Sequence, residues 1–251
     1  MKSQKVAVQL IIFGEQITTH LDKVLDDVHV AGYEGFEMRV HADPGEENRI
    51  RNAISSRRLT YVGGHCRLEE LTNLEIATRI VETIQRLGGR YLMVSSRYET
   101  LDQYHQAVLL LDDVGRRCAD ADLTLCYHNH FWEFGKINGT TPFDILTGQT
   151  DADLVKLCPD VYWIHTAGES PADFLARYRD RCPCIHLKDG LAGDQPQEVR
   201  ELGHGTVDLP KTINAALDCN PEWLIVEQDR TQRQPIESIR LSREYLRNHG
   251  V

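Results

Sequence analysis

The feature that most constrains this chain is a regular alternation of short apolar runs and longer amphipathic segments along its length. The apolar runs predict strands at 6–12, 35–39, 59–63, 90–95, the start of 123–134, 155–160, 184–188 and 223–227. The amphipathic segments carry apolar residues at helical spacing and predict helices at 17–31, 44–55, 71–87, 101–119, 142–147, 171–178, 209–217 and 236–248. This alternation indicates parallel strands joined by right-handed crossovers.

The length of the chain narrows the choice among folds of this kind. Its 251 residues are close to the roughly 250 that are typical of a (β/α)8 barrel. Eight strand–helix units in that length favour a closed barrel over an open, doubly wound sheet. No linker, low-complexity tract or break in composition divides the chain. We therefore expect an α/β fold, a single (β/α)8 (TIM) barrel domain spanning residues 1–251.

Composition excludes several classes of partner. The net charge is −10, from 28 basic and 38 acidic residues, and an acidic chain is poorly suited to bind the phosphate backbone of a nucleic acid. No glycine-rich phosphate-binding motif is present, so we expect no nicotinamide or nucleotide cofactor. No apolar run approaches the roughly 20 residues of a membrane span.

The cysteines and the start of the chain indicate the compartment. Seven cysteines form no CxxC pair, and the first residues lead into a strand-like run without a secretory cleavage site. We interpret these cysteines as free thiols that fill apolar space. The expected location is the cytoplasm. An oligomer is possible, but no sequence pattern demonstrates it.

Polar residues gather where the predicted strands end. The apolar start of 123–134 gives way abruptly to His128, Asn129 and His130. In barrels of this class, the chemistry takes place at the carboxyl ends of the strands. Each of the last four predicted strands ends with a potential metal ligand, and these are His128, Asp160, His186 and Glu227.

A mixture of imidazole and carboxylate ligands indicates which ions such a site would hold. It suits Mn²⁺, Zn²⁺, Co²⁺ or Fe²⁺ better than the oxygen-only shells of Ca²⁺ and Mg²⁺. We expect a divalent cation, with Mn²⁺ preferred and Zn²⁺, Co²⁺, Fe²⁺ or Mg²⁺ as alternatives. Each residue alone also has a structural interpretation, as a histidine bonded to a backbone carbonyl or a carboxylate that caps a helix.

Several motifs carry a resemblance to a known family. Tyr127 to Phe134 reads Y-H-N-H-x-x-E-F, and later segments read Ile-His-Leu-Lys-Asp at 185–189 and Leu-Gly-His-Gly-Thr at 202–206. In this order the motifs resemble one branch of the sugar phosphate isomerase/epimerase proteins. These belong to the xylose isomerase-like TIM barrels, which also include endonuclease IV, inosose dehydratases, hydroxypyruvate isomerases and ketose 3-epimerases.

The resemblance implies a metal site and a type of reaction. The family's ligands are a glutamate, an aspartate, a histidine and a second glutamate, and the last three correspond to Asp160, His186 and Glu227. The first corresponds to His128, so this chain departs from the pair of glutamates that exchange protons in epimerases. The implied activity is isomerisation, epimerisation or elimination on a sugar, keto-sugar or cyclitol, by proton abstraction next to a carbonyl. Glu227 or His128 would be the base.

Further residues are candidates for roles in catalysis or substrate binding, each with a structural alternative. Glu133 could replace the missing carboxylate, or it could cap a loop. Substrate contacts are expected from residues at or just beyond the strand ends: His65, Lys188, Glu37, Trp163 and His204. The alternatives are a buried structural histidine for His65, a surface salt bridge for Lys188, simple packing for Trp163, and a plain glycine turn at 203–205 for His204. We also expect His130 to point the same way as His128 and to orient a ligand.

Two other functions compete with this interpretation. One is a non-catalytic sugar-binding barrel or the partner subunit of an oxidoreductase, which would carry no metal and exchange no substrate protons. The other, more remote, is a phosphodiesterase like endonuclease IV. It would need more metal ligands than one per late strand, and a basic surface that a net charge of −10 does not favour.

Overall fold

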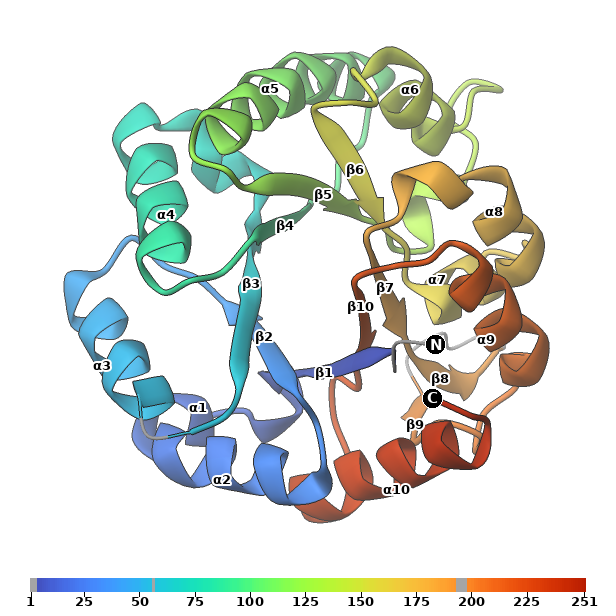
Figure 1. Ribbon diagram of the computed structural model, residues 1–251. Coiled ribbons are helices and arrows are strands. Elements are labelled where there is room, and N and C mark those ends of the chain that lie inside the picture. The colour runs from blue at the N-terminus through green and yellow to red at the C-terminus, as the bar shows by residue number, and fades with distance from the viewer. Residues whose placement is uncertain (1–3, 56, 193–197) are drawn as a thin grey trace.

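A computed structural model describes residues 4–55, 57–192 and 198–251. Its main sheet has eight parallel strands in the order β6-β5-β4-β3-β2-β1-β10-β7, which curve into a barrel inside a ring of helices (Figure 1). This confirms the predicted α/β barrel. The barrel strands are β1 Lys5–Gln9, β2 Gly35–Arg39, β3 Thr60–Arg67, β4 Tyr91–Ser95, β5 Thr124–His128, β6 Val155–Cys158, β7 Cys184–Leu187 and β10 Trp223–Val226.

The helices follow the strands in the predicted alternation. Several begin at residues with a known start signal: Asn73 caps α4, Thr100 caps α5 together with Gln103, and Pro171 opens α8. The α-helices are α1 Gln16–Thr19, α2 Leu21–Ala31, α3 Pro44–Ser55, α4 Leu74–Arg86, α5 Leu101–Asp120, α6 Pro142–Gln149, α7 Val161–Thr166, α8 Pro171–Arg177, α9 Leu209–Asp218 and α10 Pro235–Asn248. Short 3-10 helices lie at η1 Leu10–Phe13, η2 Leu68–Thr72, η3 Trp132–Phe134 and η4 Arg179–Arg181.

The barrel closes between β6 and β7 at one place. A single parallel bridge joins Asp160 to His186, and the His186 N–H donates to the Pro159 carbonyl at 2.9 Å. Pro159 has no N–H of its own, so it cannot extend a regular ladder between these strands. The seam therefore closes at the carboxyl ends, where two of the predicted ligands lie.

Two apolar cores hold the barrel together. The larger one fills the space between the strands and the helices, and the smaller one fills the barrel interior with side chains such as Met93, Trp223 and Ile225. Three cysteines, Cys126, Cys158 and Cys184, belong to the interior core. All seven cysteines of the chain are free, and six of them are buried. This confirms the prediction that the cysteines are free thiols that fill apolar space.

A bulge in β3 changes the direction of its polar end. The pairing of β2 with β3 shifts between Phe36 and Glu37, so that Glu37 pairs with Gly63 and Val62 is passed over. Tyr61 packs in the outer core and Val62 in the inner one, and strict alternation from there would turn His65 outward. The extra residue turns His65 into the barrel. Gly63 permits this, since a Cβ there would lie 1.9 Å from the Tyr91 carbonyl oxygen.

The structure differs from the sequence-based expectations at several element ends. Residues 10–12 form a 3-10 helix instead of extending the first strand, and Gly148 lies within α6 instead of ending it. Helix α7 was not expected, and it begins where Asp160 caps its first turn. Within the segment 189–206, strand β8 Asp189–Leu191 pairs antiparallel with β9 Glu198–Arg200, and residues 193–197 lie outside the described residues.

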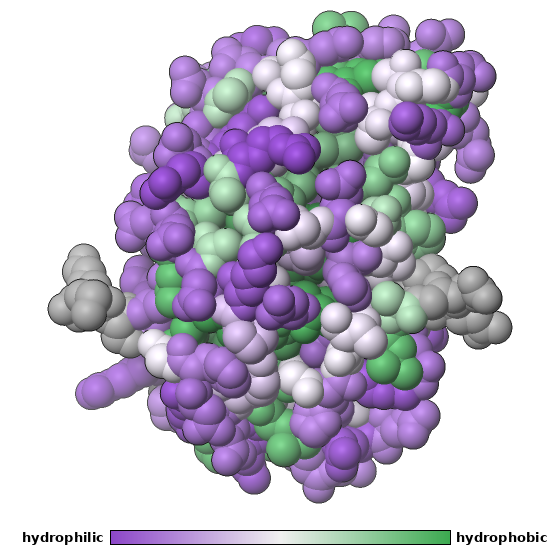
Figure 2. All heavy atoms as spheres, turned by 90° about the vertical axis from the view of Figure 1, so that its right-hand side faces the viewer, coloured by the Kyte–Doolittle hydropathy of each residue, from purple (hydrophilic) through white to green (hydrophobic). Residues whose placement is uncertain are grey.

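The outer surface is mostly hydrophilic on the face shown in Figure 2, with smaller apolar areas between the polar side chains. This is the outer side expected of amphipathic helices whose apolar side covers the sheet. No helix within the described ranges is long and apolar enough to cross a membrane.

Candidate active site and metal centre

The four predicted ligands meet at one end of the barrel. His128 ends β5, Asp160 follows β6, His186 lies in β7 and Glu227 follows β10. One ligand atom from each lies within 4.8 Å of the others, and all four residues are buried. Parallel strands bring these residues together from positions 26 to 99 residues apart in the chain, since their carboxyl ends share one end of the barrel.

Two buried atoms of this cluster have no hydrogen-bond partner among the described residues. Asp160 caps α7 through Oδ1, which accepts the N–H groups of Tyr162 at 2.9 Å and Trp163 at 3.0 Å. Its Oδ2 is left without a hydrogen bond, as is Nδ1 of His128. Buried polar atoms are normally paired, so an acceptor oxygen and a ring nitrogen left in this way fit the donor set of a cation. The residues present therefore fit a divalent metal.

His186 is oriented from both sides of its ring. Nδ1 contacts Oε2 of Glu227, and Nε2 lies 2.7 Å from Oε2 of Glu37. A carboxylate on the second nitrogen of a histidine ligand fixes its tautomer and increases its basicity. Burial opposes a charge on His186, but Cys158, Glu37 and Glu227 raise its pKa well above the ordinary value. Glu37, predicted to contact substrate, is fully buried and has Oε2 directed at this histidine.

Lys188 is a buried cation among three carboxylates. Its Nζ lies 3.0 Å from Glu227 Oε1, 2.6 Å from Asp229 Oδ2 and 3.7 Å from Asp160 Oδ2. Burial lowers its pKa, but these neighbours more than offset that and raise it. Burial likewise raises the pKa of Glu227, and Lys188 and His186 outweigh it, so that Glu227 stays ionised. The surface salt bridge considered from the sequence is excluded, because Lys188 is fully buried.

His128, the last residue of β5, and Asn129, which follows it, have different roles. Burial, reinforced by His186, holds the pKa of His128 well below its ordinary range, so the ring is neutral and able to donate an electron pair. Asn129 Oδ1 accepts the Asp160 N–H at 3.1 Å, and its Nδ2 donates to the Asp160 carbonyl at 3.5 Å. Asn129 thereby ties the end of β5 to the ligand after β6.

Glu133 braces the polar loop and is not one of the clustered donors. Its Oε1 accepts the Tyr127 hydroxyl at 2.9 Å, and its Oε2 accepts the His130 N–H at 2.8 Å. The side chain is fully buried, and burial raises its pKa to about 8 against the opposing effect of these hydrogen bonds. Its geometry matches the loop-capping alternative, because one oxygen accepts a hydroxyl from strand β5 and the other a backbone N–H of the loop.

The remaining predicted contacts fall into two groups beside the cluster. His65 lies 3.3 Å from Glu37 Oε1 through Nδ1, and its Nε2 is 3.1 Å from Ser95 Oγ. On the other side, His130 stacks on Trp132 at a centroid distance of 4.0 Å and lies 5.8 Å from Trp163. Burial and Lys188 lower the pKa of His130 to about 3. The result is a neutral aromatic wall next to the charged cluster.

Lys188 also reaches this wall, since its Nζ lies 4.6 Å from the centroid of the Trp163 ring. His204, by contrast, is exposed, in a loop whose Gly203 and Gly205 N–H groups donate to the Asp189 carboxylate at 3.0 and 2.9 Å. The structure therefore brings Trp163 to the cluster and leaves His204 on a braced surface loop.

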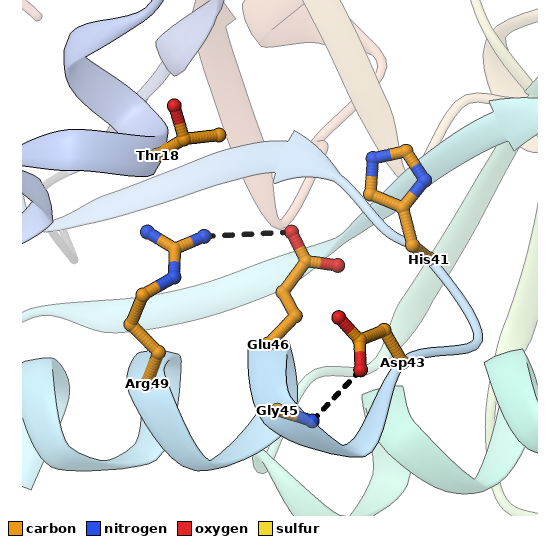
Figure 3. A pocket seen from close by; sticks show the side chains of 6 residues that line it. All are labelled: Thr18, His41, Asp43, Gly45, Glu46 and Arg49. Carbon is orange, nitrogen blue, oxygen red and sulfur yellow. Dashed lines mark hydrogen bonds and ion pairs between the residues drawn. The ribbon is translucent and has the colours of Figure 1, made fainter.

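A separate polar hollow of about 420 Å³ lies between the first two strand-to-helix connections (Figure 3). Glu46 projects into it from the first turn of α3 and faces Arg49, 3.6 Å away. It shares no residue with the four-donor cluster, and its lining residues are Thr18, His41, Asp43, Gly45, Glu46 and Arg49.

Known proteins with similar sequences and structures were found by comparison. An inosose dehydratase from Lacticaseibacillus casei is 22% identical over 93% of this chain and 90% of its own length. A solved sugar phosphate isomerase/epimerase from Parabacteroides distasonis superimposes with a TM-score of 0.82 at 19% identity, covering 98% of this chain and 94% of that one. The IOLI protein, solved with a bound zinc atom, superimposes with a TM-score of 0.74 at 15% identity and 98% coverage of both chains.

The family assignment rests on the sequence match. The family described as xylose isomerase-like TIM barrel matches residues 25–249, which is nearly the whole chain. The barrel topology agrees with that description. The chain belongs to the xylose isomerase-like TIM barrel family.

Proposed function

We propose that this protein is a divalent-metal-dependent isomerase, epimerase or lyase that acts on a sugar, keto-sugar or cyclitol. The observation that carries the proposal is the buried cluster of His128, Asp160, His186 and Glu227, in which two donor atoms have no hydrogen-bond partner among the described residues. Relatives named inosose dehydratase and neighbours named sugar epimerase support the substrate class. Mn²⁺, Zn²⁺, Co²⁺, Fe²⁺ and Mg²⁺ remain the candidate ions, and the cytoplasm the expected location.

The metal and the protein's own residues would have different roles in the reaction. An ion held by the four donors would supply a Lewis acid that polarises a substrate oxygen. Glu227 is the base: Lys188 and His186 keep it ionised, and its oxygens lie at the cluster. His128 is the second candidate base, because its ring is neutral. Lys188 holds Glu227 in place and presents a fixed positive charge to substrate oxygens.

The surroundings of the cluster are suited to a ring with polar edges. Trp163 and the stacked pair of His130 and Trp132 offer apolar faces next to Lys188. We propose that one face of a sugar or cyclitol lies against this wall while its adjacent oxygens turn toward the donors. His65 would meet the substrate from the side of β3, where it is held by Glu37 and Ser95.

Hydrogen exchange tests the proposal directly. Metal-loaded and chelator-treated protein would be incubated in D₂O with a panel of keto-sugars and keto-cyclitols, followed by mass spectrometry and NMR. We expect deuterium at the carbon next to the carbonyl, together with an isomerised, epimerised or dehydrated product, only in the loaded sample. Tight sugar binding without exchange anywhere in the panel would contradict the proposal and favour a non-catalytic barrel.

A further inference from the structure

Cys158 lies directly below the four-donor cluster. It precedes Asp160 by two residues in the chain and belongs to the core inside the barrel. Ligand atoms of His128, Cys158 and His186 lie within 4.8 Å of one another, and all three side chains are buried. Both histidines are also members of the four-donor cluster. The thiol therefore forms a second candidate donor set with the two histidines of the centre.

An independent observation points to a ligand at this position. Nδ1 of His128 is buried and has no hydrogen-bond partner among the described residues, and the side chain is 1% exposed. Strand register pairs Cys158 directly with His128 across β5 and β6. A neutral imidazole nitrogen without a hydrogen-bond partner, next to a thiol, offers two electron-pair donors to a metal ion.

The other two cysteines of the barrel interior provide an internal contrast. Cys126 is paired with Lys156 and Cys184 with Trp223 in the strand registers. Within the described residues, no group of candidate metal donors includes either of them. All three thiols are buried in one core, so burial alone does not distinguish Cys158. Its two histidine neighbours do.

We propose that Cys158 Sγ is a ligand of the divalent ion, and that the centre consequently takes a thiophilic ion, Zn²⁺ or Co²⁺, in preference to Mg²⁺ or Mn²⁺. This rests on the metal centre of the proposed function and names its ion class. Thiolate and imidazole donors favour Zn²⁺ and Co²⁺ over the ions that prefer oxygen. On binding, a metal–sulfur bond forms as the S–H bond breaks, and the proton leaves to solvent.

The geometry allows this with small shifts. Zinc–sulfur and zinc–nitrogen bonds are roughly 2.3 and 2.0–2.1 Å, so two ligands of one ion lie at most about 4.4 Å apart. One donor atom each from His128, Cys158 and His186 lies within 4.8 Å of the other two.

Cobalt spectroscopy on the full chain tests the assignment. Wild type, Cys158→Ser, Cys158→Ala and the matched control Cys184→Ser would be titrated with Co²⁺ while the near-ultraviolet thiolate-to-cobalt charge-transfer band is recorded. We expect the band in wild type and Cys184→Ser and its loss in both Cys158 variants. Zn²⁺ affinity should fall about tenfold or more without the thiolate, whereas Mn²⁺ affinity should change little.

The possible results distinguish the role of Cys158 from the existence of the metal centre. Co²⁺ binding by wild type without the band would overturn the role of Cys158 and leave the four-donor centre standing. A band that persists in a folded Cys158 variant would do the same. Failure of wild type to bind Co²⁺, Zn²⁺ or Mn²⁺ would overturn both this inference and the metal centre of the proposed function. Should one Cys158 variant fail to fold, the other carries the comparison, and the wild-type spectrum tests thiolate ligation on its own.

Discussion

The early and late halves of the barrel contribute differently to its polar end. Strands β5, β6, β7 and β10 supply the clustered donors His128, Asp160, His186 and Glu227. Strands β2, β3 and β4 supply Glu37, His65 and Ser95, which contact one another, and of these Glu37 reaches His186. The late half thus presents the atoms that would bind an ion, and the early half fixes the orientation of one of them.

This division has an electrostatic reason. Donors for a cation must keep atoms free, and such atoms are costly when buried. In the late half the buried charges of Lys188 and His186 lie against the carboxylates of Asp160 and Glu227, which limits that cost. The early half carries Glu37 as its buried carboxylate in the site, and that carboxylate is engaged by a histidine.

The largest effect is expected from the late half, at Glu227. Glu227→Gln keeps the size of the side chain and removes its capacity to accept a proton. We expect solvent deuterium exchange into the active keto-substrate to fall by about 10²–10⁴-fold, the range for loss of a general base. Glu169→Gln, at an exposed glutamate, should leave the rate unchanged. Full exchange activity in Glu227→Gln would assign the base to another residue, with His128 first.

Lys188 tests whether the late half needs its buried cation for stability. Lys188→Met would leave Glu227, Asp160 and Asp229 without their shared partner, so the free energy of unfolding in urea should fall by roughly 3–5 kcal/mol. Lys211→Met is the matched control: this lysine is 60% exposed and lies 3.6 Å from Asp173, so a change below about 1 kcal/mol is expected. Equal effects of the two substitutions would contradict the electrostatic account. Added Zn²⁺ or Mn²⁺ should restore part of the loss in Lys188→Met.

Glu37 tests the orienting role of the early half. Glu37→Gln removes the negative charge from the second nitrogen of His186. We expect metal affinity to weaken by about 10–100-fold, as for other partners of histidine ligands. Competition with a chromophoric chelator measures it. Unchanged affinity, with the fold intact by circular dichroism, would show that the two halves act independently.

Glu133 should have the smallest effect on the metal centre, because it is not one of the clustered donors, and its effect should lie in the pH dependence of stability. Its pKa is raised by burial from 4.5 to about 8 in the folded protein. Because this pKa is raised on folding, the Glu133 carboxyl contributes stability that is fully present below pH 4.5 and is lost as the pH rises through about 8. Unfolding free energies of wild type and Glu133→Gln should therefore shift in favour of the variant across that window. Parallel pH profiles would show that Glu133 titrates alike in both states.

The sequence predicts the barrel and the convergence of the four candidate donors, because both follow from periodicity. Apolar runs identify the strands, and their polar last residues converge once those strands are parallel, as His128 and Glu227 do. Residues whose position depends on irregular backbone were harder to interpret. The β3 bulge turns His65 inward, and Asp160 caps the unpredicted helix α7. The pairing of Asn129 with the Asp160 backbone leaves no periodic signal.

The sequence also does not predict which further residues lie beside the four candidate donors. Cys158 resembles the other apolar-run cysteines when read along the chain, and only strand register brings it opposite His128. Glu133 was considered as both base and loop cap, and its two hydrogen bonds to Tyr127 and His130 correspond to the second. In both cases the decisive information is a contact between neighbouring strands or within a loop, not a residue type.

The most direct test of the central claim is the metal stoichiometry of the purified protein. Native mass spectrometry and calorimetry would compare wild type with Asp160→Asn, which keeps the helix cap but weakens the free oxygen as a donor. The four-donor centre predicts one divalent ion per chain in wild type and strongly weakened binding in Asp160→Asn. Absence of stoichiometric binding in wild type, or equal affinity in the variant, would contradict it.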